Sequence, residues 1–186
     1  MDITSYRQQR AYAAQYGFIV GLIWIASFSL FIIGLTQPLM GNLSLLVGIL
    51  SIAAAGYLVR KFRHEVAPLR FWHTWWMATQ IFMYASLLMA AAQFIYFRYI
   101  DNGLLVDTYA SIMQQPEAVA MLQSMMPGEN VEQVGTEVIG LLQSISPIQL
   151  TFEFLIYNLM SSFIFAFPAA WIGKSGKTPA SPSQNQ

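Results

Sequence analysis

The chain contains no cysteine and few charged residues. Without cysteine it can form no disulfide, no thiolate metal site and no cysteine nucleophile. Charged residues make up 10% of the sequence and hydrophobic residues 56%, whereas soluble domains carry about 25% charged residues. The formal net charge is zero, so the sequence lacks the basic excess typical of nucleic-acid binding. The low share of charged residues and the high share of hydrophobic residues indicate an integral membrane protein.

Four long apolar stretches lie at about residues 16–35, 43–59, 71–97 and 148–172. Their lengths suit a hydrocarbon core of ~30 Å, although the second is near the lower limit. Aromatic residues cluster at both ends of the third stretch, as they do at the two headgroup levels of a membrane. The first stretch is longer than the apolar part of a signal peptide, so we expect it to remain as a span. The predicted fold class is all-α, an integral membrane bundle of four transmembrane helices.

Basic residues are missing from the whole segment between Tyr99 and Gly173. Apart from Arg98, they lie before the first stretch, between the second and third, and after the fourth: Arg7, Arg10, Arg60, Lys61, Arg63, Arg70, Lys174 and Lys177. Because positive residues near a span stay cytoplasmic, this distribution predicts cytoplasmic N- and C-termini. We expect a multi-pass membrane protein.

The segment at residues 100–147, expected on the outer side, is acidic and contains two sets of apolar residues. Pro116 and the Pro127–Gly128 pair favour breaks and helix starts within it. We predict two short amphipathic helices that lie on the outer membrane face or cap the bundle. Their acidic character favours packing on protein over binding to anionic lipid. The apolar sets are Val119, Leu122, Met125 and Met126, and then Val131, Val134, Val138, Leu141, Leu142 and Ile145.

The composition divides the chain into three parts. Residues 1–15 are polar and predict a cytoplasmic N-terminal lead, and residues 16–172 form the membrane domain. Residues 173–186 are rich in Gly, Ser, Pro, Asn and Gln and predict a disordered cytoplasmic tail. Within the first span, Gly17 and Gly21 stand four residues apart, a spacing that favours close helix packing in the bundle or in a homodimer.

Two ionisable residues, Glu153 and Arg98, lie inside or at the edge of the predicted spans. Glu153 is about a turn and a half inside the fourth span, and a charge costs ~2.5–3.5 kcal/mol at mid-bilayer and less near the interface. If the third and fourth spans are neighbours, Arg98 and Glu153 meet near the outer interface. We interpret them as a structural ion pair or, as the alternative, as a proton or ion site.

Polar residues continue along the same two spans, with Gln93 in the third and Asn158 in the fourth. Their spacing keeps them on one face of each helix. Such faces are compatible with a water-lined path, but interhelical hydrogen bonding, worth ~0.6 kcal/mol per bond, is the favoured interpretation. The polar sets are Thr79, Ser86 and Gln93 in steps of seven, and Gln149, Glu153, Tyr157 and Ser161 in steps of four.

No residue pattern predicts a catalytic centre, a metal site or a cofactor. The His64–Glu65 pair lacks the second histidine of the zinc-protease motif, and His73 beside Trp72 is interpreted as packing. The methionines of the outer segment suit Cu(I) but also build adaptable contact surfaces, which we favour. The sequence contains neither a phosphate-binding glycine loop nor a serine elbow.

A combination of local features resembles a known family. The second span ends in the basic sequence Arg60–Lys61–Phe62–Arg63, and the aromatic third span ends in Phe97–Arg98–Tyr99–Ile100–Asp101. An acidic helical segment follows, and the fourth span closes on lysines. Over about residues 10–178 the chain resembles the bacterial membrane proteins grouped as domain of unknown function 4199. The resemblance implies a multi-pass protein with four spans in a bacterial inner (plasma) membrane, and it implies neither an activity nor functional residues.

Two functions remain open on the sequence alone. The first is a non-enzymatic accessory or scaffold subunit of a membrane complex, favoured by small-residue packing, few polar groups in the spans and a methionine-rich acidic outer segment. The alternative is a small-solute or proton-linked transporter that uses Glu153, Arg98 and Asn158. The expected partners are the lipid bilayer and either a membrane protein or further copies of this chain, and no nucleic acid is expected.

Overall fold

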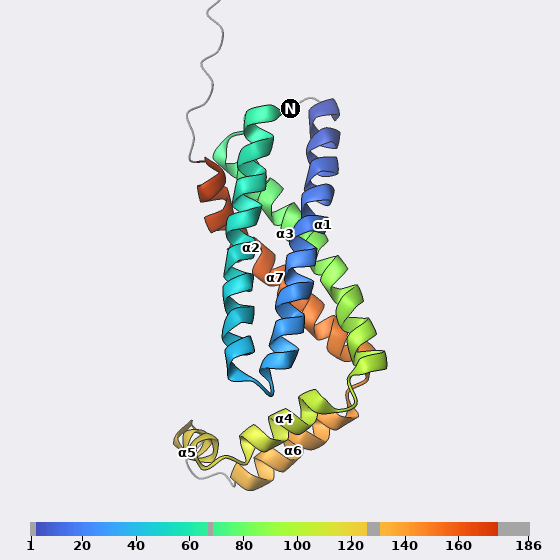
Figure 1. Ribbon diagram of the computed structural model, residues 1–186, viewed down its shortest axis with the longest axis vertical. Coiled ribbons are helices and arrows are strands. Elements are labelled where there is room, and N and C mark those ends of the chain that lie inside the picture. The colour runs from blue at the N-terminus through green and yellow to red at the C-terminus, as the bar shows by residue number, and fades with distance from the viewer. Residues whose placement is uncertain (1–2, 67–68, 126–130, 175–186) are drawn as a thin grey trace, which may run out of the picture. The chain divides into compact units, whose positions relative to one another are not determined.

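The computed structural model describes residues 3–66, 69–125 and 131–174, and within them every element is helical (Figure 1). Four elements are long and apolar enough to cross a membrane, and they confirm the predicted all-α fold class with four spans. The tail predicted to be disordered falls almost entirely outside the described residues. The elements are α1 (Ile3–Gly34), α2 (Pro38–Glu65), α3 (Phe71–Ile95) with a π-helical continuation (Tyr96–Ile100), α4 (Leu104–Met113), α5 (Pro116–Met125), α6 (Val131–Ser144) and α7 (Pro147–Lys174).

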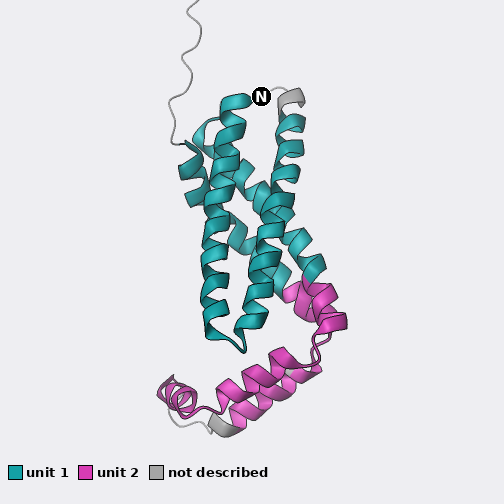
Figure 2. Ribbon diagram, viewed as in Figure 1, with its two compact units in different colours: residues 1–92, 154–186 teal, residues 93–153 magenta. Residues whose placement is uncertain are grey.

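The chain forms two compact units (Figure 2). The first unit comprises residues 1–92 and 154–186, and therefore contains α1, α2, most of α3 and most of α7. Its core draws apolar side chains from all four helices, for example Val20, Val59, Ile81 and Ala166, all of which are fully buried. The core side chains of α1 and α3 include Trp24 and Phe82, whose stacked rings lie 5.8 Å apart between centroids.

Small residues set the distance between α1 and α3. A Cβ atom added at Gly17 would lie 2.5 Å from the Cβ of Tyr84 and 2.8 Å from the carbonyl oxygen of Ile81. One turn further along, a Cβ atom at Gly21 would lie 3.3 Å from the Cα of Ala85. The glycine pair of the first span therefore serves packing within the bundle, which is one of the two roles that its spacing favoured.

The C-terminal ends of α2 and α7 also approach closely. A Cβ atom at Gly56 would lie 3.0 Å from the carbonyl oxygen of Ala169 and 2.7 Å from the Cβ of Ile172. Nearby, the Nη1 of Arg63 donates a 2.6 Å hydrogen bond to the carbonyl oxygen of Gly173. This bond satisfies one of the carbonyl groups that the last turn of α7 leaves without an intrahelical partner.

Helix α2 begins at Pro38, five residues before the predicted start of the second span at residue 43. Proline suits the first turn of a helix because its missing backbone N–H would have no intrahelical partner there, and Pro38 accordingly starts α2. The link from α1 is correspondingly short. A Cβ atom at Gly34 would lie 2.5 Å from the backbone nitrogen of Gly41, so the two backbones nearly touch.

The second unit, residues 93–153, contains three short helices instead of the two predicted. The helices α5 and α6 were expected, whereas α4 was not. Gly103, at φ +92°, reverses the chain before α4, and the Asp101 side chain accepts a 3.4 Å hydrogen bond from the backbone N–H of Leu105. A glycine in the left-handed conformation and an acidic residue near the first turn together give α4 its start.

The close approach of α1 and α3 generates a stability prediction. The substitution Gly17→Ala should lower the free energy of unfolding by about 1–3 kcal/mol, because the added methyl group meets backbone as well as side-chain atoms. Thermal unfolding of the purified protein in detergent measures the change. Gly48→Ala is the matched control, since its Cβ would lie 3.7 Å from the nearest atom, the Oγ of Ser27. Equal melting temperatures for the two variants would contradict the assignment.

Candidate functional site

Two serines join α1 and α2 by reciprocal hydrogen bonds. The Ser27 hydroxyl donates to the carbonyl oxygen of Ser44 at 2.9 Å, and the Ser44 hydroxyl donates to the carbonyl oxygen of Ser27 at 2.8 Å. One turn away in α1, the indole N–H of Trp24 donates to the buried Ser51 hydroxyl at 2.9 Å. These bonds engage the side-chain donors of Trp24, Ser27 and Ser44. The sequence pattern did not single out Trp24, Ser27 or Ser51. The spacing of Ser44 and Ser51, which places them on one face of α2, is the signal that could have done so.

A second set of polar contacts joins α3 to α7. The hydroxyl oxygens of Ser86 and Ser162 lie 3.4 Å apart, and the Trp75 indole donates to the carbonyl oxygen of Phe163 at 3.3 Å. Ser86 also donates to the carbonyl oxygen of Phe82 in its own helix. Ser86 belongs to the polar face predicted for the third span. In the fourth span it meets Ser162, which is not a member of the polar set that includes Ser161.

The predicted pair, Arg98 and Glu153, lies within the second unit, and both side chains are exposed. The Arg98 guanidinium lies 5.8 Å from the centroid of the Tyr99 ring. Among the described residues, no ion pair joins Arg98 to Glu153. Arg98 stands in the π-helical continuation of α3, and such segments shift the direction of the following side chains relative to an α-helix.

The two predicted amides, Gln93 and Asn158, belong to different units. Gln93 is 2% exposed, and its Oε1 is buried without a hydrogen-bond partner among the described residues. Asn158 is half-buried in α7, and its backbone carbonyl accepts a 2.8 Å hydrogen bond from the Ser162 hydroxyl. Its side chain belongs to the wall of a cavity in the first unit.

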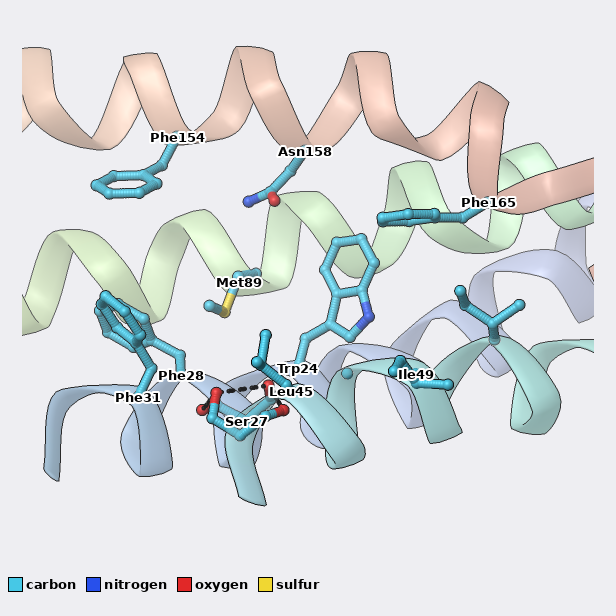
Figure 3. Close-up of a pocket in the computed structure, with 13 residues that line it drawn as sticks. Trp24, Ser27, Phe28, Phe31, Leu45, Ile49, Met89, Phe154, Asn158 and Phe165 are labelled. Atoms are coloured by element: carbon cyan, nitrogen blue, oxygen red, sulfur yellow. Dashed lines mark hydrogen bonds between the residues drawn. The ribbon is translucent and has the colours of Figure 1, made fainter. Parts of the chain in front are cut away.

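This cavity has a volume of about 430 Å³ and lies among all four helices of the first unit (Figure 3). Its walls are mainly aromatic and aliphatic, and none of the described residues that line it is charged. Figure 3 shows the Asn158 amide extending from α7 into the space near Met89 and Trp24. The lining residues are Trp24, Ser27, Phe28, Phe31, Ser44, Leu45, Gly48, Ile49, Ile52, Met89, Phe154, Asn158 and Phe165.

The second unit carries exposed apolar residues on each of its short helices. On α4 and α5 they occur in pairs three or four residues apart that share a helix face, and on α6 an exposed leucine is followed four residues later by an isoleucine outside the helix. The exposed apolar pairs are Tyr109 and Ile112, Met121 and Met125, and Leu141 with Ile145 just beyond α6. The described charged residues among them are acidic and exposed: Asp107, Glu117 and Glu137. The unit therefore presents a surface that is both apolar and negatively charged.

A smaller cavity of about 330 Å³ lies within the second unit, and its lining includes the polar residues Asp101, Asn102, Asp107 and Gln143. Asp101 already accepts hydrogen bonds from the Tyr96 hydroxyl and the Leu105 backbone, each at 3.4 Å. Among the described residues, no three His, Asp or Glu side chains lie close enough together to hold a metal ion. The carboxylate of Asp101 is thus engaged in fixing the start of α4.

Four long apolar helices and a polar network that joins them define a multi-pass membrane protein. The chain matches the sequence model of the family described as "Protein of unknown function (DUF4199)" over residues 15–175, and it belongs to this family. This confirms the resemblance that the basic, aromatic and acidic segments predicted. No curated protein matches the chain, and no solved structure matches it.

The positions of Arg98 and Glu153 predict the result of a double-mutant cycle. Glu153→Gln should change the free energy of unfolding in detergent by less than ~0.5 kcal/mol, because no ion pair of Glu153 among the described residues would be lost. Arg98→Gln and the double variant should give additive changes in detergent melting temperature. A coupling of ~1 kcal/mol or more between the two substitutions would show that the side chains pair in the membrane.

Proposed function

We propose that this protein is a non-enzymatic accessory or scaffold subunit of a membrane complex. Its partner-binding surface is formed by the exposed apolar pairs of α4, α5 and α6. The observation that carries the proposal is the exposure of Met121, Met125 and Leu141, each above 60%. Large exposed apolar groups that gather on one unit mark sites of interaction with proteins or membranes.

The charge of the second unit supports a protein partner over a lipid surface. Interfacial helices that bind anionic lipid are rich in Lys and Arg on their polar face. Here the segment from Tyr99 to Gly173 has no basic residue, and Asp107, Glu117 and Glu137 are exposed. A partner with an apolar centre and basic residues around it complements this surface. The methionines suit such contacts because their unbranched side chains adapt to irregular partner surfaces.

The hydrogen bonds of the first unit support a structural role for its polar residues. The hydroxyls of Ser27, Ser44, Ser86 and Ser162 are all engaged with neighbouring helices or with their own helix. A water-lined transport path needs polar groups that are free to face water. The accessory proposal therefore accounts for these residues with fewer assumptions than a transporter does. It includes the cytoplasmic termini that the basic residues favour and the bacterial inner membrane that the family resemblance implies.

Site-specific photo-crosslinking in the native host tests the proposed surface. A photoreactive amino acid at position 121, 125 or 141 should give one crosslinked species of defined mass that contains a second protein. The matched control is position 46 in α2, where Leu46 is similarly exposed but lies in the first unit. Mass spectrometry identifies the crosslinked protein. Equal crosslinking at position 46, or no protein adduct at any of the three test positions, would overturn the assignment of this surface.

A further inference from the structure

The cavity of the first unit has the size and chemistry of a small-molecule site. Its volume of about 430 Å³ lies within the ~300–1,000 Å³ range of ligand pockets. The aromatic side chains of Trp24, Phe28, Phe31, Phe154 and Phe165 come from α1 and α7 and form much of its wall. Such sites combine apolar walls with a few placed polar groups that orient the ligand.

One polar side chain of the wall is left to orient a ligand. The Trp24 indole N–H is bonded to Ser51, and the hydroxyls of Ser27 and Ser44 are bonded to each other's carbonyl oxygens. The Asn158 amide makes no hydrogen bond with any described residue, and it extends into the cavity (Figure 3). Its NH₂ group therefore remains a donor, and its oxygen remains an acceptor.

The position of Asn158 limits the class of ligand. It lies near the middle of α7, a helix that spans the membrane, so its amide lies deep in the hydrocarbon region. The headgroup of a phospholipid stays at the membrane surface and does not reach this depth. In the part of the chain that the structure describes, no charged residue lines the cavity, and an ionised ligand there would lack the pairing that buried charges require. The ligand must therefore be uncharged and soluble in the membrane interior.

We propose that this cavity binds a planar, uncharged, membrane-soluble carbonyl compound of the isoprenoid-quinone class. The Asn158 NH₂ group donates a hydrogen bond to a ring carbonyl oxygen, and the ring packs against the indole of Trp24 and the ring of Phe165. The isoprenoid chain leaves past Leu45 and Ile49, which line the cavity and are exposed on α2. This inference does not depend on the proposed partner-binding surface, which lies in the other unit.

A binding titration of the full-length protein with decylubiquinone tests the proposal. In detergent micelles, the quinone should quench tryptophan fluorescence in a saturable manner, because Trp24 lies in the cavity wall. Native mass spectrometry should show one quinone per chain. Asn158→Ala should weaken binding by roughly three- to tenfold, as expected for one hydrogen bond within a membrane. Gly48→Leu, which adds a side chain to the cavity wall, should weaken it further.

The control variant is Ser161→Ala on the same helix, because Ser161 does not line the cavity. It should bind like the unaltered chain, and all variants are compared only after their melting temperatures show that they are folded. Quenching that is unsaturable, or equal in Asn158→Ala, Gly48→Leu and Ser161→Ala, would mean that the quinone only partitions into the micelle and would overturn the proposal. A copurified phospholipid that excess quinone does not displace would equally overturn it, by assigning the cavity to an acyl chain.

Discussion

Hydrogen bonding inside hydrocarbon constrains the packing of the four spans, because lipid offers no partner to a polar group. The serines of α1 and α2 meet this constraint reciprocally: Ser27 and Ser44 each donate to the other's carbonyl oxygen. Such a pair forms only at one rotation and one register of the two helices. The bond from Trp24 to Ser51 fixes the same register a second time, two turns further along α2. A few polar residues thus determine the alignment of the long apolar helices.

Glycines then decide which helices come closest. Gly17 and Gly21 bring α1 against α3, and Gly56 brings α2 against the end of α7. The α2–α7 contact lies near the C-terminal ends of both helices, whereas the cavity is lined by earlier residues of α2 and α7, such as Gly48 and Asn158. Within the first unit, α7 runs obliquely to α2 (Figure 1). Helices that touch at one end and cross at an angle separate toward the other, and large aromatic side chains there enclose space instead of filling it.

The sequence predicted the spans well because length and hydropathy are local properties. The pattern also placed Gly17 and Ser86 on packed faces. It did not predict that Ser162 and not Ser161 meets Ser86, since that choice depends on the rotation of α7 against α3. The helix α4 was missed because its start depends on the conformation of Gly103 and the side-chain contact of Asp101, which periodicity does not reveal.

The same limit applies to the candidate sites. Charge alone drew attention to Glu153 and Arg98, yet the described structure leaves both side chains exposed and does not pair them. Asn158 was also predicted as a site residue, but its setting could not be foreseen, because the cavity wall combines residues from four separate helices. An amide that faces an apolar cavity without a partner costs about 1–3 kcal/mol relative to a bonded one. An apolar residue at position 158 would avoid that cost, so the amide there is explained most simply by a molecule that accepts its hydrogen bond.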